Sequence, residues 1–497
     1  MEKSAFKNNY LSFISKYYPY FLVSIAAIVL VSLLATSSPS YTMNPWDDVS
    51  CYYGVAKAMN NGRVLYKEIY EQKGPYMYFM YQVFLLFNQT GFTGLFIGEM
   101  IIAVLCAIIS YKTITLVDNN TTRGIIFTIL VEALYYNSYV YYLGGSAEEM
   151  VLPLLYLSAY IMTRLLVKDD LTKKSAIALG IACGYIFMVK FSIALIIVFE
   201  IAGICIYYAC NKKYKELLHF GLTSIGGFVL IIIPEILYLL FTQSFKDFFV
   251  VYIHNNISVY KMSNSTKHLV ETFFRYSWFS YLSLFSVLLI FINRDINYKK
   301  KIAFAIYLFS LLFISFKEGM LWYYCQPLVI LAPLCAVFLP RTSTLIHDAK
   351  YYVSQALLIA SSIIVIFTFI FIDESNMVHM SRTKDFYPYY QMAEVIERDN
   401  LDKDKRTMLA YQTMDNDLYL IANIAPSEKY FCYLNIFSTL PEGNKEQREY
   451  IINNKVTYVF TQHDFSGIEE FKNYELVYSF ETREYARYLY RLKGVLE

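Results

Sequence analysis

Long apolar runs recur along most of this chain, and they constrain its fold more than any other feature. A helix that crosses a bilayer needs roughly 20 apolar residues, because its backbone polar groups must be satisfied within the segment. The composition agrees, since 57% of the 497 residues are hydrophobic and only 17% are charged. The sequence therefore predicts an α-helical polytopic membrane protein. We expect about twelve spans, of which the second, sixth and tenth are short, at residues 19–38, 75–90, 92–113, 123–142, 148–166, 174–189, 191–210, 217–242, 273–293, 301–316, 320–340 and 351–373.

Lys and Arg residues accumulate in alternate loops, and this pattern predicts the topology. Basic residues favour the cytoplasmic side of a membrane protein. If the N-terminus is inside, every inside loop is basic, as at 164–174, 212–215 and 294–301. The first apolar run is followed by Pro45-Trp46-Asp47 rather than a small-residue cleavage site, so we expect an uncleaved span. An even number of spans then places the C-terminal region outside.

From about residue 374 the apolar runs shorten and charge rises, which predicts two domains. These are a transmembrane domain at 1–373 and a soluble extracytoplasmic α/β domain at 374–497. Short strands that alternate with helices are typical of a small α/β layer. No Gly-rich phosphate loop occurs there, so we expect this domain to cover or shape a membrane site. Its predicted elements are helices at 387–399, 415–424 and 445–454 and strands at 407–411, 429–434 and 457–461.

Charge and cysteine content exclude several classes of function. The net charge is only +2 and the basic residues lie in short clusters, so the chain shows no nucleic-acid footprint. The six histidines form no HxxxH or HExxH pattern, and no metal site is assigned. Neither a disulfide framework nor a zinc site is indicated, because five cysteines fall within apolar runs and Cys51, Cys325 and Cys432 are scattered without CxxC spacing.

The first predicted outside loop, residues 39–74, is rich in ionisable residues. Apolar residues at helical spacing predict a helix over 48–60 that lies along the membrane surface. One of the adjacent residues Asp47 and Asp48 can cap this helix, which leaves the other carboxylate free to accept a proton from a hydroxyl. Ionisable groups at a membrane boundary are costly to desolvate. The loop is therefore the strongest candidate for a functional site.

Asp47-Asp48, Tyr52-Tyr53 and Lys73-Gly74-Pro75, which leads straight into a span, resemble the first outside loop of the GT-C membrane glycosyltransferases. The branch with bacterial aminoarabinose transferases and protein O-mannosyltransferases is the most similar. The resemblance continues in Ser146-Ala147-Glu148-Glu149, in Lys190 and in Trp322-Tyr323-Tyr324, and it covers about three quarters of the chain by layout more than by identity. Asp48 departs from the family's usual Glu, and Tyr323 stands where many relatives have His.

The resemblance implies transfer of a sugar from a polyprenyl-phosphate donor to an acceptor on the outer face, with inversion at the anomeric carbon. Asp47 would be the general base, with Asp48 beside it. Lys73 and Lys190 would hold the carrier phosphate, since a cation offsets the charge that develops on a departing phosphate. Further substrate contacts are expected from Glu148, Glu149, Tyr52, Tyr53, Tyr323 and Tyr324. Two adjacent aspartates do not specify a full ligand set, so a divalent metal stays an open alternative.

Other functions also stay open. A flippase or transporter of lipid-linked sugars should carry charged or broken helices near the bilayer midplane, whereas ionisable residues here gather at the outer ends of spans. An envelope polysaccharide polymerase or ligase uses the same donors, and a scaffold needs no chemistry. Glu148, Glu149 and Lys190 can also be explained without a function. The two glutamates could simply lie at the membrane interface, and Lys190 could extend its ammonium to the membrane surface. The abundance of Tyr, Phe, Lys, Asn and Ile indicates an AT-rich bacterial genome. We therefore expect a bacterial plasma membrane and a cell-envelope acceptor, namely a glycopolymer, lipid or protein.

Overall fold

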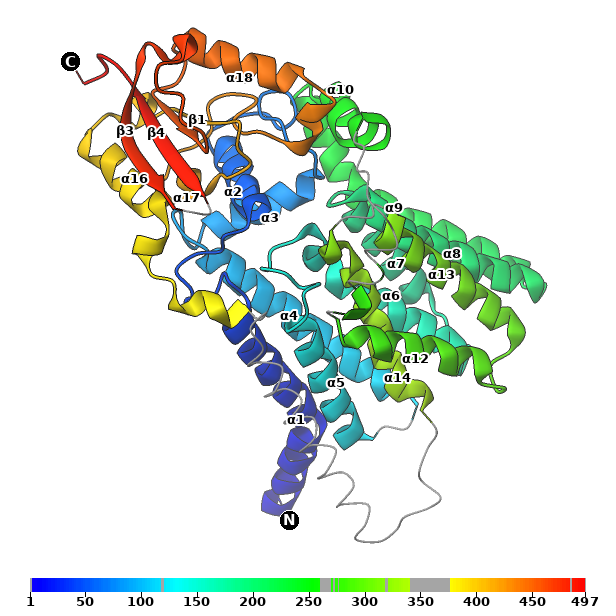
Figure 1. Ribbon diagram of the computed structural model, residues 1–497. Coiled ribbons are helices and arrows are strands. Elements are labelled where there is room, and N and C mark those ends of the chain that lie inside the picture. Colours follow the sequence, from blue (N-terminus) through cyan, green and yellow to red (C-terminus); the bar gives the residue numbers. More distant parts are fainter. Residues whose placement is uncertain are drawn as a thin grey trace. The chain divides into compact units, whose positions relative to one another are not determined.

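The computed structural model describes residues 2–117, 120–259, 270, 273–275, 277–317, 321–339, 376–482 and 485–496 (Figure 1). The chain divides into two compact units, each built from three separate segments. Unit 1 comprises Met1–Ser38, Gly98–Ile232 and Ser263–Val378, and unit 2 comprises Pro39–Ile97, Ile233–Met262 and His379–Glu497. The first outside loop and the C-terminal segment thus belong to one unit. The predicted span 351–373 and the predicted domain boundary lie outside the described residues.

Unit 1 consists of apolar helices. Among the described residues, five helices are long and apolar enough to cross a membrane, namely α1 from Lys16 onward, α4, α6, α8 and α9. The predicted helical membrane fold is confirmed, whereas the count of twelve spans stays a prediction. The helices are α1 (Glu2–Leu34), α5 (Thr121–Tyr136), α6 (Ala147–Lys168), α7 (Lys173–Phe187), α8 (Phe191–Cys210), α12 (Phe279–Ile292), α13 (Tyr298–Lys317), the 3₁₀ segment Trp322–Leu331 and α14 (Ala332–Phe338), with most of α4 (Thr93–Ile114) and α9 (Tyr214–Phe241).

Glycines allow two pairs of unit 1 helices to approach closely. A Cβ atom on Gly180 of α7 would lie 2.0 Å from the carbonyl oxygen of Ser224 in α9. A Cβ atom on Gly203 of α8 would lie 2.8 Å from the carbonyl oxygen of Ala303 in α13. Helices in a bilayer associate through such packing of small residues, because lipid supplies no hydrophobic drive between them.

Unit 2 joins the first outside loop to a small α/β fold. Its sheet has the order β1-β2-β4-β3, with β1 parallel to β2 and the other pairs antiparallel (Figure 1). The parallel register runs from Met408 opposite Tyr458 to Tyr411 opposite Thr461. The strands are β1 (Met408–Tyr411), β2 (Tyr458–Thr461), β3 (Tyr474–Glu481) and β4 (Ala486–Leu492). The α-helices that lie wholly in this unit are α2 (Asp47–Asn60), α3 (Pro75–Leu85), α10 (Phe245–Phe248), α16 (Pro388–Arg398), α17 (Asp417–Ile421) and α18 (Glu442–Ile452), and a π-helix spans Phe249–Val259.

Most elements predicted for the C-terminal segment are confirmed to within a few residues, and β3 and β4 follow the last one that was predicted. The strand predicted at 429–434 is wrong. This stretch makes only two backbone hydrogen bonds beside β1, from Ala410 N to the Phe431 oxygen and from Tyr433 N to the Thr413 oxygen. Its apolar side chains serve packing instead, since the Phe431 ring lies 3.0 Å from the place of a Cβ on Gly54 in α2.

Helix α2 confirms the helix predicted at 48–60, but unit 2 buries it. Every residue from Val49 to Ala58 is buried. Lys57 at its C-terminal end donates hydrogen bonds to the carbonyl oxygens of Tyr419 and Leu420 and to the side chain of Asn423, at 3.1, 3.3 and 2.8 Å. This ammonium is therefore a second, buried donor to two carbonyl groups at the end of α17, which also accept the backbone N–H groups of Ile424 and Asn423. Burial lowers the pKa of Lys57 to about 7.

Candidate functional site

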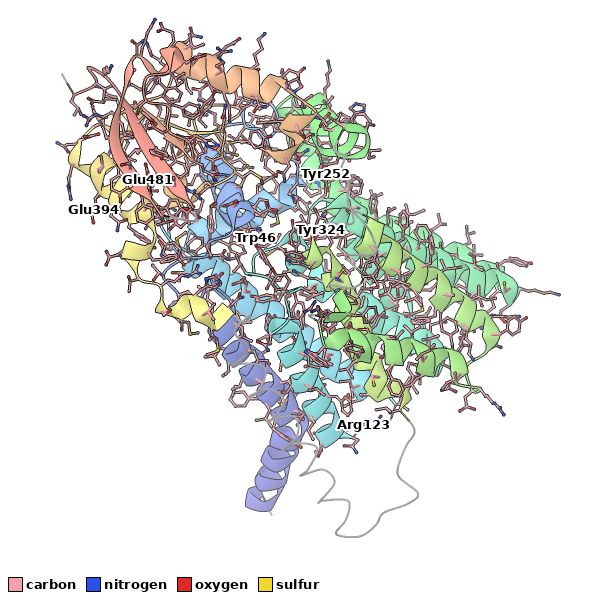
Figure 2. The ribbon with its side chains drawn as sticks, viewed as in Figure 1. Trp46, Arg123, Tyr252, Tyr324, Glu394 and Glu481 are labelled. Atoms are coloured by element: carbon pink, nitrogen blue, oxygen red, sulfur yellow. The ribbon has the colours of Figure 1, made fainter. Side chains whose placement is uncertain are left out.

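Asp47 and Asp48 form the first turn of α2, which begins directly after Trp46 (Figure 2). Neither aspartate caps the helix, because Trp46 occupies the capping position and makes no side-chain capping bond. The expectation that one carboxylate would be used as a cap is therefore wrong. Both carboxylates instead lie near the positive end of the helix dipole, where negative charge is favoured.

Asp47 has the surroundings of a proton acceptor. Among the described residues no group donates a hydrogen bond to its side chain, while its backbone oxygen accepts one from the Ser50 hydroxyl. Burial and the neighbouring charges of Asp415 and Asp48 raise the pKa of Asp47 to about 7, although Arg487 acts in the opposite direction. A carboxylate with this pKa takes a proton more readily than an ordinary aspartate at neutral pH.

Asp415 and Arg487 come from the C-terminal segment and were missed by the sequence analysis. Asp415 is 1% exposed, and its carboxylate accepts hydrogen bonds from the Tyr389 hydroxyl at 2.5 Å and from Arg487 Nε at 2.9 Å. A buried carboxylate needs such partners to stay charged. This pair places one fixed negative and one fixed positive charge near Asp47.

Asp417 adds a second buried carboxylate at the start of α17. Its side chain interacts with Ser50 of α2, and one of its oxygens has no hydrogen-bond partner among the described residues. Burial, followed by the charges of Asp415 and Asp47, raises the pKa of Asp417 well above its usual range. The sequence signal was Asp415-Asn416-Asp417 directly after a predicted strand, since functional residues often follow the carboxyl ends of parallel strands.

Lys73 belongs to the same unit, where hydrogen bonds hold its backbone. Its backbone N–H donates to Glu71 at 2.8 Å and to the Tyr78 hydroxyl at 3.0 Å, and its carbonyl accepts from the Tyr66 hydroxyl at 2.7 Å. Its ammonium lies 5.6 Å from the ring centre of Tyr52. Tyr66 adopts a left-handed backbone with φ of 66°, which costs energy in a bulky residue and indicates that the neighbouring contacts enforce this turn.

Tyr52 joins the acidic and basic parts of this arrangement. Its hydroxyl donates to Asp48 at 3.3 Å, while its ring faces Lys73. Glu71 is buried and its pKa is raised by burial, although the Lys73 charge opposes that effect. The structure thus brings Asp48, Tyr52 and Lys73 together. Tyr53 instead packs into the core of unit 2, with its ring 4.8 Å from that of Tyr81.

Unit 1 holds a second group of the predicted residues. Lys190, in the turn between α7 and α8, has its ammonium 2.6 Å from Glu148 and 3.7 Å from the ring centre of Tyr324. The rings of Tyr323 and Tyr324 meet edge to face at 4.8 Å. The positive charge of Lys190 is therefore already compensated by Glu148.

Glu149 has a local structural role in unit 1. Its carboxylate accepts from the backbone of Gly145 at 2.7 Å, and its own backbone donates to the capping side chain of Ser146 at 2.9 Å. Glu149 is fully buried, so these bonds fix the start of α6. A substrate contact by Glu149 stays a prediction.

Carboxylates also occur inside the apolar helices, which the sequence analysis did not consider. Glu200 lies at the middle of α8, where its carboxylate accepts a hydrogen bond from the Ser158 hydroxyl. That hydroxyl lies 3.0 Å from the Tyr307 hydroxyl. The carboxylate of Glu99, near the beginning of α4, accepts a hydrogen bond from the Ser37 hydroxyl. Side-chain partners within unit 1 thus reduce the cost of burying both groups.

No metal site emerges from the described residues, since no group of three or more His, Cys, Asp or Glu side chains there is arranged to hold an ion. A divalent metal therefore stays an open alternative from the sequence, with no assigned ligands.

Comparisons with known proteins bear on the fold. No family model and no curated sequence matches the chain. The crystal structure of ArnT from Cupriavidus metallidurans bound to undecaprenyl phosphate superimposes with a TM-score of 0.64 at 12% identity, over 97% of this chain and 99% of that chain. The chain has the GT-C fold. The apo structure of the same ArnT gives a TM-score of 0.63 at 12% identity over 99% of both chains. The GT-C fold predicted from the first outside loop is thus confirmed over nearly the whole length.

Proposed function

We propose that this GT-C protein is a membrane glycosyltransferase that moves a sugar from a polyprenyl-phosphate donor to a hydroxyl of a cell-envelope acceptor. The observation that carries the proposal is the carboxylate of Asp47, which has no hydrogen-bond donor among the described residues and a pKa of about 7. The likeness to an ArnT that binds undecaprenyl phosphate supports a carrier of that chemical class.

Asp47 would act as the general base. Its carboxylate takes the proton of the acceptor hydroxyl while that oxygen forms a bond to the anomeric carbon. The bond between the anomeric carbon and the phosphate oxygen breaks on the opposite face, so the configuration inverts and polyprenyl phosphate leaves with the electron pair. A positioned general base typically contributes 10²–10⁴-fold to such a step.

Lys73 would stabilise the departing phosphate. Three hydrogen bonds hold the backbone of this residue, and its ammonium lies 5.6 Å from the ring centre of Tyr52. Fixed charge at a site where charge develops is worth more than mobile charge, because no reorganisation is needed during the reaction. Lys190 is a weaker candidate for this role, since Glu148 already neutralises its charge.

The C-terminal segment would adjust the base. Asp415 raises the pKa of Asp47 and Arg487 lowers it, so the two residues oppose each other beside the catalytic group. A base is most effective when its pKa lies near the working pH. In this proposal the C-terminal segment is part of the catalytic apparatus, and the unit lies on the outer face, as the basic inside loops predict.

The test is transfer of radiolabelled sugar from a panel of polyprenyl-phosphate sugars by the purified protein in lipid, with mixed envelope extract as acceptor. We expect incorporation that Asp47→Asn lowers at least 100-fold, while Asp404→Asn, an exposed aspartate of the same unit, keeps wild-type transfer. Full transfer by Asp47→Asn would remove the general-base assignment. Movement of the carrier between leaflets without any incorporation would replace the transferase by a flippase.

A further inference from the structure

Unit 2 contains two cysteines, and their sulfur atoms touch. The other six of the chain's eight cysteines belong to the segments of unit 1. Cys51 lies in the second turn of α2, and Cys432 lies in the stretch that runs beside β1. Their Sγ atoms are 3.9 Å apart although 381 positions separate them in the sequence. Both side chains are buried, with 5% and 1% exposed.

The surroundings of both thiols are well fixed. Cys51 is held within a helix that is buried along most of its length. Cys432 stands between the two residues, Phe431 and Tyr433, whose backbones bond to Ala410 and Thr413. A disulfide needs the two sulfurs to come from 3.9 Å to about 2.05 Å. The two sulfur atoms are already at van der Waals contact, so a disulfide needs only a small movement of the two segments.

We propose that Cys51 and Cys432 form a disulfide that ties α2 to the C-terminal segment. This inference rests on the orientation given in the proposed function, because disulfides persist in oxidising compartments outside the cytoplasm. The other six cysteines lie in the unit made of apolar helices, so the two cysteines of the predicted outer region are the ones that meet.

The oxidant would be a disulfide of a thiol-oxidising protein or small molecule of the envelope. The Cys51 thiolate attacks one sulfur of that disulfide and expels the other as a thiolate. The Cys432 thiolate then attacks Cys51 in the mixed disulfide and releases the oxidant as a dithiol. Two thiols lose two electrons and two protons, which the oxidant takes up. The exchange takes place before α2 is packed, since both sulfurs are buried afterwards.

The proposed disulfide would help to position Asp47, the candidate base. Asp47 precedes Cys51 by four residues, so both lie on one face of α2. A covalent link at Cys51 therefore restrains the first turn of α2, where Asp47 lies near Asp415. Cys51 and Cys432 are positioning residues in this proposal.

The test measures the thiols of the full chain in its membrane. Membranes are isolated in the presence of N-ethylmaleimide, denatured and digested, and the peptides are analysed by mass spectrometry with and without later reduction. We expect a peptide pair that joins Cys51 to Cys432 in more than half of the chains and disappears on reduction. The six cysteines of unit 1 should carry maleimide. Maleimide on both Cys51 and Cys432 before reduction overturns the proposal.

Two variants keep the outcomes distinct. Cys51→Ser should leave Cys432 free for maleimide, and the wild-type measurement stands even if that variant fails to accumulate. In a Cys51→Ser, Cys432→Ser background, the exposed residue Lys403 is changed to cysteine and labelled in intact cells with an impermeant maleimide. Labelling together with a reduced wild-type pair overturns the disulfide alone. Absence of labelling together with a reduced wild-type pair overturns both the disulfide and the outer orientation. Neither result depends on transfer activity.

Discussion

In the proposed reaction, the rate of sugar transfer should rise about tenfold between pH 6 and pH 8. With a pKa of about 7, the Asp47 carboxyl is about one-tenth deprotonated at pH 6 and about nine-tenths deprotonated at pH 8. Only the deprotonated form can take the acceptor proton. The cause of the raised pKa is burial, helped by Asp415 and Asp48, so the effect should follow these groups.

The assay is kcat/KM at low donor concentration from pH 5 to pH 9, because this ratio reports the pKa of the free enzyme. The profile should have unit slope below its midpoint and a plateau above it. A flat profile from pH 5.5 to pH 8, or a midpoint near 4, would refute the reasoning. Asp404→Asn is the matched control and should leave the midpoint unchanged.

The same shift has a consequence for stability. The pKa of Asp47 is higher in the folded chain than the usual 3.8, so the folded state holds its proton more tightly than the unfolded state. Stability is therefore lost as pH rises from about 4 to about 7. Asp47→Asn removes this effect, so its unfolding temperature should exceed that of wild type at pH 8 and match it at pH 4. The expected gain at pH 8 is about 2 kcal/mol, after allowing for solvent at this partly buried group. A less stable Asp47→Asn at pH 8 would contradict the assigned burial.

Three further substitutions test the same unit. Lys73→Ala should lower kcat/KM for the polyprenyl-phosphate donor by about 100-fold, and the exposed Lys67→Ala should leave it unchanged in the same radiolabel assay. Arg487→Gln should move the midpoint of the pH profile above that of wild type, because Arg487 lowers the pKa of Asp47; a midpoint at or below the wild-type value would count against this. Lys57→Ala should destabilise unit 2 by about 1–2 kcal/mol in thermal unfolding, since Asn423 and the carbonyls at the end of α17 lose a buried donor, whereas unchanged unfolding would contradict it.

Local sequence patterns determined the helical membrane fold, α2 and the first candidate residues. Hydrophobic period and length are properties of contiguous residues, so the spans around α4, α6 and α8 could be predicted without tertiary contacts. The Asp47-Asp48 pair and Lys73 were also recognisable, because these charged residues lie close together in the sequence of one loop.

The tertiary structure decided which distant groups surround those residues. Asp415, Arg487 and Cys432 lie more than 350 positions after α2, and no periodicity connects them to it. The false strand at 429–434 has the same origin, since β-forming residues there pack against α2 instead of completing a ladder. Local pattern fixes which segments are helical and apolar, whereas pKa values and sulfur contacts depend on neighbours that only the folded chain brings within a few ångströms.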